Sequence, residues 1–140
     1  MADRVLLAED LKDLRESYSK SLEEAGFEVT AVDDGDKLYE ILKSQKFDVL
    51  VADSNMPSMS GYDACRKAIL EGILDNKETL IIGMSSDSEN QENWRGVAHL
   101  GAFYEKYHFY CGQIGEKIMR CLRNFKSGGI WKEKMPEIGW

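Results

Sequence analysis

The sequence lacks any long hydrophobic run. Its longest apolar stretches, residues 49–52 and 80–82, are far shorter than the roughly 20 residues that a membrane-spanning helix needs. The N-terminus also lacks a basic segment followed by an extended apolar one, so no secretory leader is indicated. We therefore expect a cytoplasmic protein that does not insert into a membrane.

Cysteine is scarce and follows no metal-binding or disulfide pattern. The three cysteines, Cys65, Cys111 and Cys121, are odd in number and show no Cys-x-x-Cys spacing. We interpret them as reduced, half-buried packing residues of helices. His99 and His108 likewise have no partner at ligand spacing, which favours ordinary surface roles.

Basic residues are outnumbered by acidic ones. The chain has 18 Lys and Arg against 25 Asp and Glu, so its net charge is −7. Nucleic-acid-binding modules draw most of their affinity from Lys and Arg that neutralise phosphates. Direct nucleic-acid binding is therefore not expected.

The sequence instead contains a regular alternation of strand-like and amphipathic stretches. Strands are expected at residues 4–8, 27–32, 48–53, 79–84 and 102–104, and helices at 11–25, around 38–42, and at 62–71, 89–100 and 111–125. Asp10 is the expected N-cap of the first helix, Leu11 begins its inward stripe, and Gly26 ends it. Asp34-Gly35 is expected to form a turn. Five β-α repeats predict an α/β protein with a doubly wound parallel sheet, and the apolar run 48–53 is its expected central strand.

The length of 140 residues favours one domain. We expect it to span residues 1–126, followed by a tail, 127–140, that is too short to form a second domain. Gly128-Gly129 breaks the last helix, yet the tail is too apolar to be a solvated one because it contains Ile130, Trp131, Met135, Ile138 and Trp140. Packing on its own domain and docking on a partner or a second copy both remain open.

Polar residues stand at the carboxyl ends of the expected strands, where doubly wound sheets bind their ligands. Glu9-Asp10 follows the first strand, Asp53 ends the third, Ser85 follows the fourth, and Lys106 follows the fifth. Three neighbouring carboxylates repel one another unless a cation joins them. Mg²⁺ suits this set, because it binds through a few carboxylates and keeps positions for water and phosphate oxygens.

Asp53 is also suited to nucleophilic chemistry. A carboxylate can accept a phosphoryl group, and the transfer needs little more than positioning and positive charge around the phosphoryl oxygens. Mg²⁺, Lys106 and the Ser85 hydroxyl would supply that environment.

Over about residues 3–126 the chain resembles the receiver domain of two-component response regulators. The resemblance rests on Leu6-Leu7-Ala8-Glu9-Asp10, on residues 53–61, on Met84-Ser85-Ser86, and on Gly101-Ala102 with Lys106. It implies a flavodoxin-like (βα)5 fold with strand order 2-1-3-4-5.

The resemblance also implies a role for each site residue. Asp53 would be the phosphoacceptor; Glu9, Asp10 and Asp53 would hold Mg²⁺ together with the backbone carbonyl of Asn55; and Ser85 would contact the phosphoryl group. In the family a switch aromatic precedes the lysine, a role that falls to Phe103 or, alternatively, to Tyr104.

The loop after the fifth strand departs from the family pattern. The gap between Gly101 and Lys106 is shorter than usual, and Tyr107 stands where a proline normally follows the lysine. This leaves open whether Lys106 points into the site or to solvent.

We therefore expect a phospho-acceptor switch, not a metabolic enzyme, with at most slow autodephosphorylation. A histidine kinase or a histidine phosphotransfer protein would donate the phosphoryl group. A protein target, or a second copy in a homodimer, would bind the fourth helix, fifth strand and fifth helix. One alternative is a degenerate receiver that docks without phosphorylation. A small-ester phosphatase is the other, although Asn55 stands where its acid-base carboxylate would be.

Overall fold

The computed structural model describes residues 2–75, 77–86, 89–97, 100–106 and 112–127. In chain order the elements are β1 (Arg4–Ala8), α1 (Lys12–Glu24), β2 (Glu28–Val32), α2 (Gly35–Leu42), β3 (Val49–Asp53), α3 (Gly61–Leu70), β4 (Leu80–Ser85), α4 (Gln91–Arg95), β5 (Ala102–Glu105) and α5 (Ile114–Lys126). All five strands agree with the sequence expectation to within one residue at each end.

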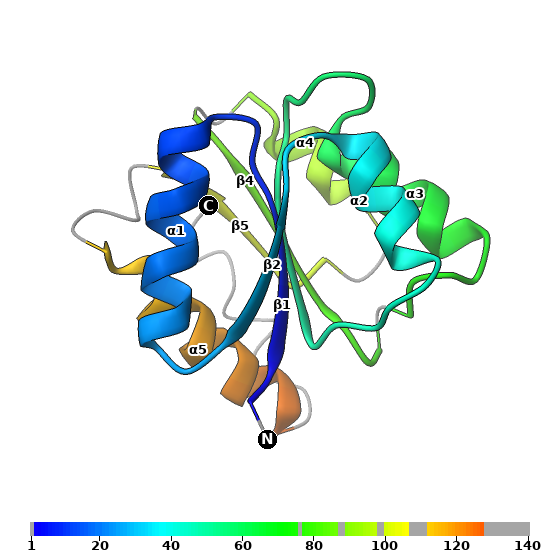
Figure 1. The fold of residues 1–140 in the computed structure, drawn as a ribbon. Helices are drawn as coiled ribbons and strands as arrows, with labels where there is room; N and C mark the ends of the chain where they lie inside the picture. The colour runs from blue at the N-terminus through cyan, green and yellow to red at the C-terminus, as the bar shows by residue number, and fades with distance from the viewer. Residues whose placement is uncertain (1, 76, 87–88, 98–99, 107–111, 128–140) are drawn as a thin grey trace.

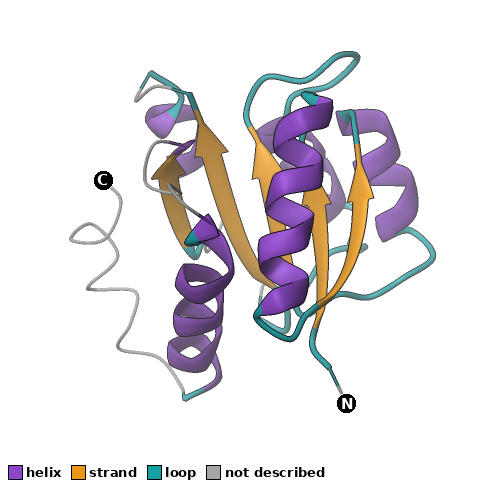
Figure 2. Ribbon diagram, turned by 60° about the vertical axis from the view of Figure 1, so that its left-hand side comes forward, coloured by secondary structure: helices purple, strands orange, loops and turns teal. Residues whose placement is uncertain are grey.

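The five strands form one parallel sheet in the order β2-β1-β3-β4-β5, which confirms the predicted fold. β3 lies at the centre, pairs with β1 and β4, and is buried along its whole length. Helices α1 and α5 cover one face of the sheet, and α2, α3 and α4 cover the other (Figure 1). The strands point toward the same edge, so their carboxyl ends lie together there (Figure 2).

Strand periodicity divides the core into two parts. Successive side chains of a strand face opposite sides of a sheet. Val5 and Leu7 therefore pack in the core beneath α1 and α5, whereas Leu6 packs beneath α2, α3 and α4. The same alternation separates the two candidate switch aromatics, because Phe103 lies in the α2–α4 core and Tyr104 in the α1–α5 core.

The start of α1 differs from the sequence expectation. Its N-cap is Leu11, whose side chain makes no cap bond, so the prediction of Asp10 as the cap was wrong. The loop after β1 runs one residue further than expected because Glu9 holds it, with Oε2 accepting a hydrogen bond from the Leu11 N–H at 3.1 Å. Leu11 is consequently 54% exposed instead of facing inward. Gly26 does end the helix, with a φ of 105° that favours glycine.

Two further helix starts were also misplaced. Asp34 does not form a turn with Gly35 but caps α2, since its carboxylate accepts a hydrogen bond from the Lys37 N–H at 2.7 Å. α5 begins at Ile114, after Gly112 with its φ of 73°.

The fourth helix is much shorter than residues 89–100. α4 contains five residues, and the chain then leaves the helix through i to i−3 hydrogen bonds from Gly96 to Asn93 and from Val97 to Trp94. Gly96 has low helix propensity, and burial of Trp94 against the sheet fixes the direction of the turn.

Cys65 and Cys121 are free and buried, so the expectation of half-buried thiols was wrong for both. Cys111, His99, His108, Tyr107 and the tail from residue 128 lie outside the described residues. Among the helices that the structure describes, none is both long and apolar enough to span a membrane.

Candidate functional site

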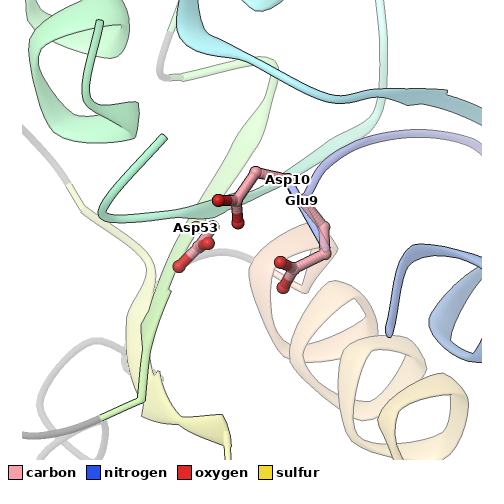
Figure 3. A group of neighbouring side chains, drawn as sticks. All are labelled: Glu9, Asp10 and Asp53. Atoms are coloured by element: carbon pink, nitrogen blue, oxygen red, sulfur yellow. The ribbon is translucent and has the colours of Figure 1, made fainter. Parts of the chain in front are cut away.

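Three carboxylates meet at the carboxyl edge of the sheet. Glu9 and Asp10 follow β1, and Asp53 is the last residue of the neighbouring β3. Figure 3 shows the three side chains directed toward one another, and one oxygen from each lies within 4.8 Å of the others. Glu9 is fully buried and Asp53 is 4% exposed.

Lys106 completes this group, which we call the acidic pocket: Glu9, Asp10, Asp53 and Lys106. Its Nζ lies 2.7 Å from Glu9 Oε1 and 3.2 Å from Asp53 Oδ2. The lysine side chain is only 10% exposed. The short connection from Gly101 therefore directs Lys106 into the pocket, and the alternative of a solvent-facing lysine does not hold in this structure.

Burial and neighbouring charges shift the pKa values of Asp53, Glu9 and Lys106 in the pocket. Burial, with the negative charge of Glu9 added to it, raises the pKa of Asp53 to about 7 although Lys106 opposes the shift. Burial also raises the pKa of Glu9, against hydrogen bonds from Lys106 and from the Leu11 N–H. For Lys106, burial acts to lower the pKa, but the contacts with Glu9 and Asp53 outweigh it and the pKa is raised.

The donor set of the pocket fits a hard divalent cation. Three carboxylates with one ammonium leave an uncompensated negative charge in a buried place, and carboxylate oxygens are the ligands that Mg²⁺ prefers. Asn55, predicted to add its carbonyl, lies two residues beyond Asp53 with an exposed side chain.

The segment after β3 returns tightly onto the strand. The Gly61 N–H donates to the Ser54 carbonyl at 3.1 Å, and Ser60 caps α3 by accepting from the Asp63 N–H. A Cβ at position 61 would lie 2.1 Å from the carbonyl oxygen of Asp53. Glycine is therefore required for α3 to begin against the end of β3.

Gly61→Ala is expected to lower the free energy of unfolding by about 1 to 3 kcal/mol, because backbone must move to admit the methyl group. Urea denaturation measures the loss. Gly96→Ala is the matched control, since the nearest atoms to its Cβ belong to the far end of the Arg66 side chain, 2.4 Å away, and not to backbone. Equal losses of unfolding free energy in the two variants would contradict the close approach of Gly61 to the Asp53 carbonyl.

Ser85 ends β4 next to the pocket. It is buried, and its Oγ accepts a hydrogen bond from Asn90 Nδ2 at 3.2 Å. Of the predicted site side chains, the structure thus brings Glu9, Asp10, Asp53 and Lys106 together and places Ser85 on the strand beside Asp53.

Sequence reasoning missed two residues that support the site, Arg15 and Trp94. Arg15 from α1 donates from Nη1 to the carbonyl of Glu9 at 3.0 Å, which braces the loop after β1. Trp94 donates from Nε1 to Ser54 Oγ at 2.7 Å, directly beside the phosphoacceptor candidate Asp53. The sequence signal for the contact of Trp94 with Ser54 was a single tryptophan within the otherwise polar stretch 89–96.

Comparison with known protein sequences relates the chain to response regulator receiver domains. A family model described as "Response regulator receiver domain" matches residues 5–104. The response regulator receiver protein CpdR of Brucella abortus is 45% identical over 65 residues, which cover 46% of this chain and 54% of that protein. The chain spans about half the length of the first curated relatives that it matches.

Solved structures share the fold. The chemotaxis response regulator CheY4 of Vibrio cholerae superposes with a TM-score of 0.75 at 22% identity, covering 87% of this chain and 99% of that one. The receiver domain of the sensor histidine kinase PA1611 from Pseudomonas aeruginosa gives 0.75 at 21% identity, covering 91% and 100%, and that structure has a magnesium ion coordinated in its active-site cleft.

Proposed function

The chain belongs to the response regulator receiver domain family, and on that premise we propose that it is a Mg²⁺-dependent phosphoacceptor in two-component signalling. Asp53 would take a phosphoryl group from a phosphohistidine of a histidine kinase or a histidine phosphotransfer protein. The observation that carries this proposal is a buried carboxylate, Asp53, held 3.2 Å from the buried ammonium of Lys106 at the carboxyl edge of a parallel sheet.

The transfer uses groups that this chain supplies. A carboxylate oxygen of Asp53 attacks phosphorus, the P–N bond of the donor breaks, and its electron pair leaves with the imidazole, which departs neutral when its other nitrogen carries a proton. Lys106 donates to one phosphoryl oxygen and the Ser85 hydroxyl to another. When bound, Mg²⁺ supplies positive charge to the phosphoryl oxygens.

The metal ligands in this proposal are Glu9, Asp10, Asp53 and the backbone carbonyl of Asn55. The raised pKa of Asp53 gives a reason for the requirement, because only the ionised carboxylate is a nucleophile. A cation beside Asp53 favours that ionised form. The magnesium ion in the active-site cleft of the PA1611 receiver domain supports this part of the proposal by fold-level analogy.

The signal would leave the molecule through protein interaction at α4, β5 and α5, with Phe103 as the switch aromatic and Tyr104 as the alternative. We propose residues 1–126 as the receiver unit and 127–140 as a tail that packs on it or on a partner. The proposal includes a homodimer formed through the same face or through the tail. It also includes a cytoplasmic location. The acyl phosphate would be hydrolysed only by slow autodephosphorylation.

Intact-mass spectrometry tests the proposal. After incubation with acetyl phosphate and Mg²⁺, the protein is expected to gain the mass of one phosphoryl group, and EDTA is expected to prevent the gain. Asp53→Asn should abolish the adduct, whereas Asp63→Asn, which changes an exposed carboxylate of α3, should retain it.

An adduct that persists in Asp53→Asn would place the acceptor elsewhere. If the wild-type protein shows no adduct and also fails to bind beryllofluoride, which mimics a phosphoryl group on a carboxylate, the phosphoacceptor role is wrong. The phosphorylation-independent docking module would then replace it.

A further inference from the structure

The predicted phosphoryl contact Ser85 is held by Asn90, the N-cap residue of α4. Its Oγ accepts a hydrogen bond from Asn90 Nδ2 at 3.2 Å, and both residues are buried. This distance is at the long end of the range for an N–H···O bond, so a small displacement of Ser85 away from α4 breaks it.

Asn90 is itself oriented by its neighbours. Its amide oxygen accepts a hydrogen bond from Asn93 Nδ2 at 3.1 Å, which directs its NH₂ group to Ser85. The carbonyl of Asn93 in turn accepts from Arg66 Nη2 of α3 at 2.6 Å. A chain of contacts therefore extends from α3, through α4, to the end of β4.

A second contact fixes α4 independently of Asn90. Trp94 is fully buried, and its Nε1 donates to the hydroxyl of Ser54, which donates to the Met84 carbonyl at 2.7 Å. The indole lies directly on Gly83, where a Cβ would be 2.3 Å from the ring. Its ring also meets Tyr62 edge-on at 6.0 Å. Trp94 therefore holds α4 against β4 and against Ser54, the residue that follows β3.

From this geometry we propose that Asn90 is a positioning residue that restrains Ser85 in the unphosphorylated protein. The inference rests on the proposed function. For Ser85 to reach a phosphoryl group on Asp53, its hydroxyl moves toward β3 and gives up the bond to Asn90, while Trp94 keeps α4 in place. A contact made only in the resting arrangement stabilises that arrangement and weakens binding of whatever requires the other one.

The expected effect is a gain of affinity. A net hydrogen-bond contribution of ordinary size corresponds to a factor of about 3 to 10 in an equilibrium constant. Asn90→Ala should therefore bind beryllofluoride, in the presence of Mg²⁺, about 3- to 10-fold more tightly than the parent protein. Structural damage would weaken binding, so the direction separates a restraint from a merely structural role.

Trp94 can report the titration. The chain has three tryptophans, so replacing Trp131 and Trp140 by phenylalanine leaves the indole beside Ser54 as the only one. Glu92→Gln is the matched control, because it changes an exposed side chain of the same helix. Asn93→Ala, which removes the group that orients Asn90, should give a smaller gain and serves as the second variant if Asn90→Ala does not fold.

A double-mutant cycle assigns the effect to Ser85. In a Ser85→Ala background, Asn90→Ala should leave beryllofluoride affinity unchanged, since the restraint acts through the hydroxyl. A second readout needs no metal: in ¹H–¹⁵N spectra of the metal-free protein, Asn90→Ala should shift the Ser85 amide resonance and leave the Trp94 indole N–H nearly in place.

The outcomes separate the two proposals. Failure of the parent protein to bind beryllofluoride would overturn the proposed function. Binding by the parent with an unchanged or weaker affinity in Asn90→Ala and Asn93→Ala would overturn only the restraint, as would a gain that persists in the Ser85→Ala background.

Discussion

Lys106→Met is expected to lower the free energy of unfolding by about 3 to 5 kcal/mol at pH 8 in the presence of EDTA. The ammonium is the cation of the acidic pocket, 2.7 Å from Glu9 and 3.2 Å from Asp53. Methionine has a similar length but no charge, so both carboxylates stay buried without it. Removing one partner from a buried ion pair has a cost of this size.

The loss should depend on pH. In the variant the two carboxyls keep their protons to a higher pH than in the wild type, because burial already raises both pKa values and the opposing lysine is gone. The folded variant therefore binds protons that its unfolded chain releases, and its stability falls as pH rises. Toward pH 5 the penalty should shrink.

Urea denaturation between pH 5 and pH 8 measures this loss. Lys126→Met is the matched control, because Lys126 pairs with Asp3 at 2.7 Å on the surface, where an ion pair contributes about 1 kcal/mol or less. Losses of equal size in the two variants, or a loss at Lys106 that is the same at all pH values, would contradict the buried-cation role.

Asp53→Asn should have the opposite effect and raise the free energy of unfolding by about 2 to 3 kcal/mol at pH 8 without metal. The pKa of Asp53 is raised from 3.8 to about 7, first by burial and then by the charge of Glu9. A shift of about 3 units corresponds to about 4 kcal/mol, and the weaker contact of an amide with Lys106 offsets part of the gain.

The sign follows from proton linkage. Between pH 4 and pH 7 the folded protein holds a proton on Asp53 that the unfolded chain has released, so this group progressively lowers wild-type stability over that range and adds no further loss above it. The amide that replaces this carboxyl in the variant cannot titrate, so the difference between the proteins should be small at pH 4 and largest above pH 7.

Mg²⁺ should reduce that difference. A ligand that binds only the folded state adds stability by mass action, and the variant has lost one of the three clustered carboxylates. Denaturation midpoints with and without Mg²⁺ test this. A variant that is less stable than the wild type at pH 8 in EDTA would show that the ionised Asp53 carboxylate does not destabilise the folded protein.

The strands were predictable because their signal is local and repeated. Continuous apolar runs bounded by charged or turn residues specify strands of a parallel sheet, and β3 is the clearest example. The gathering of Glu9, Asp10 and Asp53 follows from topology alone, since the carboxyl ends of neighbouring parallel strands meet at one edge.

Other features depend on contacts between distant segments. Asp10 has the residue type of an N-cap, yet it joins the carboxylates at the strand ends instead of capping α1. α4 ends at Gly96 with Trp94 packed on Gly83, a contact that no periodicity encodes. The direction of Lys106 and the bond from Asn90 to Ser85 likewise depend on loop geometry, so sequence alone left the first open and missed the second.

The division of the core between the two faces of the sheet also provides a means of following local opening. Cys65 on α3 lies in one half and Cys121 on α5 in the other, and both are sealed from solvent. Burial raises the pKa of the Cys65 thiol to about 12, so an alkylating reagent can reach its reactive thiolate only when that half opens. In a Cys111→Ser background the alkylation rates of Cys65 and Cys121 would separately measure the opening of the layer that contains α3 and of the layer that contains α5.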